Sequence, residues 1–169
     1  FCLSRGLGDV YKRQIYNYEK RKYPGEISMT EVLEKSINTG AVFVQKELGG
    51  KLLLKYIERF GFFEPTGIDI PEIYSQNTEL KKGYEINFAT ASYGQGIGIT
   101  PIQLAQAYCT IANGGKLVRP YIVEKILEDG AETQKQPAEF EERQVISSKT
   151  VSQLTAMLVS CLLYTSDAA

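Results

Sequence analysis

The sequence predicts an α/β domain in which helices dominate and a small β portion lies near residues 117–127. Apolar residues recur at helical spacing over most of the chain, whereas short β-branched runs occur only near its end. The 169 residues suffice for one domain, and 43% hydrophobic with 23% charged residues is typical of a globular protein.

The first predicted helix follows Ser28, because Ser28 and Glu31 form a capping-box pattern ahead of apolar residues at helical spacing. Gly49-Gly50 stops that run. A second amphipathic helix follows and ends at Gly61, which is expected to be its C-cap.

The middle of the chain combines a loop-like segment with a long uncharged one. Residues 62–82 are typical of a loop, but residues 86–115 contain no Asp, Glu, Lys or Arg and are expected to be buried inside a domain. A second capping box, Thr100 to Gln103, opens a helix in which Cys109 is expected to be a small buried residue. The polar residues of this helix form a narrow stripe, as in a nearly enclosed helix: Gln103, Gln106 and Thr110.

The end of the chain changes pattern. Residues 117–127 contain short β-like apolar runs, and Asp129-Gly130 is a hairpin signal. Residues 134–142 form a polar excursion, and a last helix is predicted to begin at Ser147 or Ser148.

Both termini differ in character from the rest. Residues 1–14 and 161–169 resemble translated sequencing-adapter read-through, so the native domain is expected to span residues 15–160. Within that span Cys109 is the one cysteine, which permits neither an internal disulfide nor a cysteine metal site.

The composition excludes several classes of function. The net charge of -1 gives no basic surface for nucleic acid, and we expect no nucleic-acid partner. Because the chain has 0 histidines, a Ser-His-Asp or Cys-His mechanism within it is excluded, and we expect no metal and no cofactor. Gly94 to Gly98 does not match a dinucleotide-binding fingerprint.

The remaining candidate chemistry lies in Ser36-Ile37-Asn38. In a continuous helix Ser36 and Asn38 project about 200° apart, so they can serve one site only if the helix breaks between them. Asn38 and Thr39 are plausible N-caps for a new helix, which fits such a break. Taken alone, the pattern favours helix-capping residues over a site, and the same pattern recurs at Ser75-Gln76-Asn77.

The residues around Ser36 resemble the transpeptidase domain of class B penicillin-binding proteins. The resemblance covers residues 27–158 and is strongest at SMTEVLEKSINTGAV, at YIERFGFFEPTGIDIP and at ATASYGQGIGITPIQLAQAYCTIANGGKLVRPYIV. It implies the α/β penicillin-binding transpeptidase and β-lactamase-like fold, with Ser36 and Asn38 as the catalytic Ser-x-Asn motif. Ser36 would relay a proton with the family's lysines, and Asn38 would bind the amide of the substrate.

The chain departs from the family at two further motifs. No serine is followed by lysine three residues later, and no Lys-Thr-Gly or Lys-Ser-Gly occurs. We therefore expect an internal fragment that is inactive alone, with the nucleophile upstream and the Lys-Thr-Gly strand downstream.

The resemblance also implies partners and a location. Peptidoglycan stem peptides and β-lactam antibiotics would bind the intact protein. Its domain would lie on the extracytoplasmic side of a bacterial membrane, held there by an anchor upstream of this segment. A non-catalytic envelope scaffold or sensor of the same fold is the alternative, and an all-helical interaction module fits the uncharged block less well.

Overall fold

The computed structural model describes residues 14–128, 131–134 and 143–166. Of the predicted foreign segments 1–14 and 161–169, residues 1–13 and 167–169 lie outside the described residues. So do the two hairpin residues 129–130 and most of the polar excursion, 135–142.

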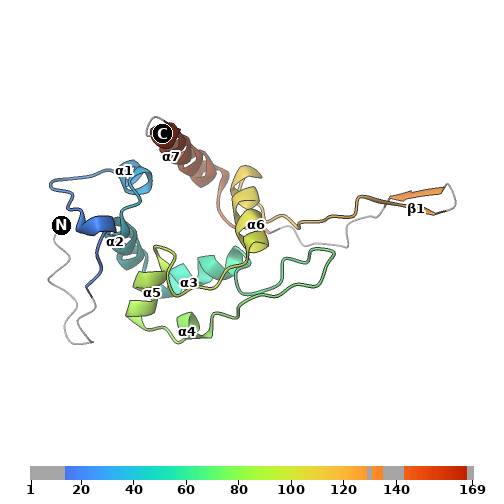
Figure 1. Cartoon of the computed structure of the whole chain (residues 1–169), viewed down its shortest axis with the longest axis horizontal. Helices are drawn as coiled ribbons and strands as arrows, with labels where there is room; N and C mark the ends of the chain where they lie inside the picture. The colour runs from blue at the N-terminus through green and yellow to red at the C-terminus, as the bar shows by residue number, and fades with distance from the viewer. Residues whose placement is uncertain (1–13, 129–130, 135–142, 167–169) are drawn as a thin grey trace.

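Helices dominate the described part of the chain, as predicted. Figure 1 shows them in an arc that runs from α1 and α2 through α3 and α5 to α6, while α7 returns to lie beside α1. The elements are η1, a 3-10 turn (Tyr18–Lys20), α1 (Met29–Glu34), α2 (Asn38–Leu48), α3 (Gly50–Arg59), α4 (Thr78–Lys81), α5 (Glu85–Ala91), α6 (Pro101–Ala112), β1 (Lys125–Glu128), β2 (Ala131–Gln134) and α7 (Ser148–Ser166).

The helix starts follow the sequence closely. Ser28 caps α1 in a full capping box with Glu31, and Thr100 does the same for α6 with Gln103. Pro101 occupies the first turn of α6, where its missing N–H is harmless. Both capping-box predictions are confirmed.

The end of α3 shows why Gly61 is required. The Gly61 N–H donates to the Glu58 carbonyl (2.9 Å) and the Phe62 N–H to the Ile57 carbonyl (3.2 Å). This is a Schellman motif, which places the residue after the C-cap in the left-handed region, and Gly61 has φ +82°. The predicted C-cap is therefore one residue late: Phe60 is the C-cap and Gly61 follows it.

A hydrophobic core lies where α3, α4 and α5 meet. Ile57, Leu80 and Phe88 form a buried cluster, one from each of these helices. The first residue of α3, Gly50, lies so close to Phe88 that an added Cβ would be 2.3 Å from its ring. The loop predicted over residues 62–82 is thus interrupted by the short helix α4, which supplies Leu80 to this cluster.

The orientation of α6 contradicts the sequence prediction. Its polar stripe faces inward, with Gln103, Gln106 and Thr110 all buried, whereas Leu104 is 47% and Tyr108 is 59% exposed. Cys109, predicted to be buried, is exposed. The reason is hydrogen bonding, because the loop carbonyls beneath α6 need donors: the Gln103 amide donates to Gly61 and Glu64, and the Gln106 amide to Val118.

The sheet lies further along the chain than predicted. β1 and β2 form an antiparallel hairpin with Glu128 opposite Ala131, which confirms the hairpin signal, and it extends away from the helices in Figure 1. Residues 117–124 do not form a strand. Their start makes only an isolated antiparallel bridge, Lys116 with Gln144, in which the Leu117 N–H donates to the Arg143 carbonyl. The N–H groups of Ile122 and Val123 donate instead to the Asp69 carboxylate.

The last helix begins as predicted. The Ser147 hydroxyl accepts from the Thr150 N–H (3.2 Å), so Ser147 caps α7. α7 continues beyond residue 160, and near that point Ser160 donates to the Glu34 carboxylate of α1. Among the helices of the described residues, none has the length and apolar character needed to cross a membrane.

Candidate functional site

The candidate site is the junction between α1 and α2, where both predicted residues lie. α1 ends at Glu34 and α2 begins at Asn38, so the helix breaks across Ser36-Ile37. This break is the condition that the sequence set for Ser36 and Asn38 to serve one site. Ile37 anchors the junction, since it is only 2% exposed.

Ser36 occupies a position that favours glycine. The Ser36 N–H donates to the Leu33 carbonyl (3.2 Å) and the Ile37 N–H to the Val32 carbonyl (2.9 Å), which is the same Schellman pattern that ends α3. Gly61 takes the left-handed position there, whereas Ser36 takes it here with φ +48°. For a residue with a Cβ this conformation is strained.

No local hydrogen bond of the Ser36 side chain offsets this strain among the described residues. The side chain is exposed, and within the part of the chain that the structure describes its hydroxyl has no hydrogen-bond partner. A capping serine looks different: the Ser28 hydroxyl accepts from the Glu31 N–H. The Schellman hydrogen bonds therefore fix the backbone at Ser36, while its exposed hydroxyl keeps its capacity to donate or accept a hydrogen bond.

Asn38 is the first residue of α2, and its amide is oriented from outside the helix. Its Nδ2 donates to the Tyr16 carbonyl (2.9 Å), which leaves Oδ1 without a partner among the described residues. An unpartnered Oδ1 can accept a hydrogen bond from the N–H of an amide ligand.

The prediction that Asn38 or Thr39 caps α2 is wrong. The N-cap is Ile37, whose side chain accepts no hydrogen bond. The cap comes instead from Asn17, whose Oδ1 accepts from both the Thr39 N–H (3.0 Å) and the Thr39 hydroxyl (3.1 Å). No pattern in the sequence links Asn17 to Thr39, since 21 residues lie between them, and sequence reasoning missed this residue.

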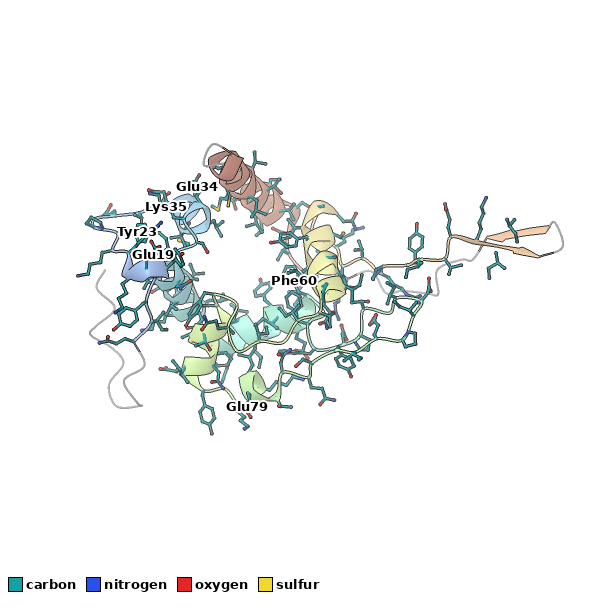
Figure 2. The ribbon with its side chains drawn as sticks, in the orientation of Figure 1. Glu19, Tyr23, Glu34, Lys35, Phe60 and Glu79 are labelled. Carbon is teal, nitrogen blue, oxygen red and sulfur yellow. The ribbon has the colours of Figure 1, made fainter. Side chains whose placement is uncertain are left out.

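The charged groups of α1 lie beside the junction. Figure 2 shows Tyr23, Glu34 and Lys35 at this end of the molecule. Lys35 Nζ pairs with Glu31 (2.9 Å) and lies 6.0 Å from the centre of the Tyr23 ring. The hydrogen bond from Lys35, followed by that from the Ser28 backbone, lowers the pKa of Glu31 below its usual value.

The second Ser-x-Asn match has a different role. Asn77 is buried, and its Oδ1 accepts from the Gly98 N–H (2.7 Å) while its Nδ2 donates to the carbonyls of Phe62, Ser75 and Gly98. With both ends of its amide bonded to backbone, Asn77 joins two loops and has no group left for a ligand.

Metal ligation finds no support in the residues that the structure describes. They contain no group of three or more His, Cys, Asp or Glu side chains that could hold a metal ion.

Comparison with known proteins gives a consistent result. A family model described as the penicillin binding protein transpeptidase domain matches residues 6–165. Stage V sporulation protein D of Bacillus subtilis is 36% identical over 143 residues, which cover 83% of this chain and 22% of that protein. The peptidoglycan D,D-transpeptidase FtsI homolog of Mesostigma viride is 31% identical over 121 residues, which cover 66% of this chain and 20% of that protein.

A solved structure agrees with these relatives. Penicillin binding protein 3 of Mycobacterium tuberculosis, complexed with aztreonam, matches with a TM-score of 0.65 and 25% identity, over 78% of this chain and 29% of that one. The chain spans about a fifth of the length of the curated relatives described above.

Proposed function

Because this chain belongs to the penicillin-binding protein transpeptidase domain family, we propose that its parent protein is a serine peptidoglycan D,D-transpeptidase. The family resemblance expected from the residues is confirmed, and so is the penicillin-binding, β-lactamase-like fold, of which this chain contributes mainly helices. The activity of the parent and the roles of individual residues are the proposal.

One observation carries the proposal beyond family membership. Ser36 stands in a left-handed position that glycine fills in the matching motif of α3, and its hydroxyl is exposed and unbonded among the described residues. A strained residue that makes no local contact is typical of functional sites, where the strain fixes a direction. This supports Ser36 as the serine of the family's Ser-x-Asn motif.

The proposed reaction is acyl transfer through a serine ester. A serine outside this chain attacks the carbonyl of the penultimate D-alanine, the peptide C–N bond breaks, and the terminal D-alanine leaves after its nitrogen gains a proton. The amine of a second stem peptide then attacks the ester, loses a proton and releases the serine. Ser36 passes protons to and from these nitrogens together with lysines of the missing motifs.

Asn38 supports the same reaction by binding. Its Oδ1 accepts the N–H of the substrate's amide, while the bond from Nδ2 to the Tyr16 carbonyl holds the side chain in place. β-Lactams would occupy this site as substrate mimics, and aztreonam is bound to the related penicillin binding protein 3. We place the domain outside the membrane of a bacterial cell, anchored by a segment upstream, by analogy with the relatives.

Labelling with a fluorescent penicillin tests the proposal. The full-length parent should gain one covalent adduct, seen on a denaturing gel and as the mass of one penicillin, and excess unlabelled β-lactam should prevent it. The 169-residue chain should gain none, because no serine in it precedes a lysine by three residues. A specific adduct on the chain alone would contradict the proposed location of the nucleophile.

The result for the parent separates the two candidate functions. Failure of a parent that carries an intact Ser-x-x-Lys to label would overturn the enzymatic proposal. A parent whose Ser-x-x-Lys serine is replaced, and which does not label, would instead be the non-catalytic scaffold or sensor.

A further inference from the structure

The start of α2 depends on a residue far away in the sequence. A helix begins with N–H groups that have no partner inside the helix. The N-cap, Ile37, supplies no side-chain acceptor. Asn17 does so in its place, because its Oδ1 accepts from the N–H and the hydroxyl of Thr39, at 3.0 and 3.1 Å.

Asn17 is itself held in one orientation. Its Nδ2 donates to the Arg21 carbonyl (3.1 Å), so the amide spans the 3-10 turn η1 and turns Oδ1 toward Thr39. The preceding residue, Tyr16, uses its carbonyl to orient the Asn38 amide (2.9 Å). Residues 16 and 17 therefore contact both residues that follow Ile37.

These contacts bear on Ser36 because its backbone is strained. A residue with φ +48° stays in that conformation only when its neighbours fix it. The buried Ile37 fixes the backbone on the C-terminal side of Ser36. Its carbonyl accepts from the N–H groups of Gly40 and Ala41 in the first turn of α2. Asn17 fixes the same turn from outside.

We propose that Asn17 is a positioning residue for the Ser36–Asn38 junction. Its side chain caps α2 and thereby sets the direction of the Asn38 amide and of the Ser36 hydroxyl, without contacting the substrate. This inference rests on the proposed transpeptidase function.

The test compares variants of the full-length parent by their second-order rate constant for acylation by a fluorescent penicillin and by their melting temperature. Asn17→Ala removes the acceptor for both Thr39 donors and should slow acylation about 10-fold to 100-fold, as expected when reacting groups move by a fraction of an ångström to 1 Å. Asn17→Asp keeps that acceptor and adds a charge that a helix N-terminus favours, but it loses the Nδ2 donor to the Arg21 carbonyl, so it should restore only part of the rate.

Asn87→Ala is the matched control. The Asn87 amide donates to the Glu79 carbonyl (2.7 Å) and joins α5 to the end of another helix, α4, so its loss removes an asparagine-to-backbone contact elsewhere. It should lower the melting temperature to a similar degree as Asn17→Ala and leave the acylation rate constant of the folded protein unchanged.

The outcomes distinguish the inference from the proposed function. If the wild-type parent is not acylated, the proposed function fails. If the wild type is acylated and Asn17→Ala reacts at the wild-type rate, or slows no more than Asn87→Ala, the positioning role alone is overturned. If Asn17→Ala does not fold, Thr39→Val decides: loss of one of the two donors should slow acylation several-fold in a folded protein, and an unchanged rate overturns the inference.

Discussion

Replacing Ser36 by alanine separates a functional serine from a capping serine. Ser28 and Ser36 flank the same short helix, and their surroundings differ. The Ser28 hydroxyl accepts from the Glu31 N–H (3.2 Å), whereas the Ser36 hydroxyl is unbonded in the described part of the chain. Ser28→Ala is therefore an internal control for Ser36→Ala.

The structure gives different magnitudes for the two changes. Ser28→Ala removes an N-cap and should cost about 1 kcal/mol of stability. Ser36→Ala removes no bond and should change stability by less than about 0.5 kcal/mol. Ser36→Gly should stabilise the protein by up to about 1 kcal/mol, because relief of about 1–2 kcal/mol of left-handed strain exceeds the entropic cost of about 0.5–1 kcal/mol for glycine.

The acylation rate should depend on Ser36 and not on Ser28, although Ser28 matters more for stability. If Ser36 relays protons, Ser36→Ala and Ser36→Gly should both slow acylation about 10²–10⁴-fold, the usual value of general acid-base help, while Ser28→Ala leaves the rate unchanged. The assay is the rate of fluorescent penicillin labelling of the full-length parent, with thermal unfolding measured on the same samples. A Ser36→Ala protein that loses about 1 kcal/mol and reacts at the wild-type rate would show that Ser36 is only a capping residue.

Two further predictions concern stability. Asn77→Ala should destabilise the domain by about 3 kcal/mol, because it removes four side-chain hydrogen bonds, three of them to the segments of Phe62 and Gly98, and leaves a left-handed alanine. Asn77→Gly should recover about 1 kcal/mol of this in thermal unfolding, and equal losses would contradict the strain at φ +50°. The lowered pKa of Glu31 stabilises the fold above its ordinary value of 4.5, and this contribution is lost as pH falls through the lower folded pKa. Melting temperatures of wild type and Glu31→Gln, which keeps the capping box, should therefore converge as the pH falls below the lowered pKa of Glu31, and a constant difference would refute the role of the charge.

The helix boundaries show how much of this fold local chemistry decides. Ser28, Thr100 and Ser147 each begin a helix as predicted, because a side-chain oxygen two or three residues ahead of a free N–H stabilises a helix start wherever it occurs. Gly61 ends α3 for an equally local reason, since the left-handed position of a Schellman motif favours a residue without a Cβ. These features need only neighbouring residues, so the sequence suffices to predict them.

The burial of α6 was not predictable in this way. Periodicity identified the stripe of Gln103, Gln106 and Thr110 but not the side on which it lies. That side depends on the carbonyls of Gly61, Glu64 and Val118, which other segments of the chain bring under the helix. Leu104 and Tyr108 are consequently on the exposed face, against the usual order of apolar and polar residues.

At the candidate site, too, some features follow from the sequence and others only from the tertiary structure. By itself, the sequence determined the family, the Ser-x-Asn motif and the fact that Ser36 and Asn38 require a break in the helix, because these depend on residue identity and on spacing within one turn. The tertiary structure alone decided that the break is made with Ser36 in a left-handed conformation and that α2 is capped by Asn17. The physical reason is that a helix N-terminus needs an acceptor but does not specify its source, and here a segment distant in sequence provides it.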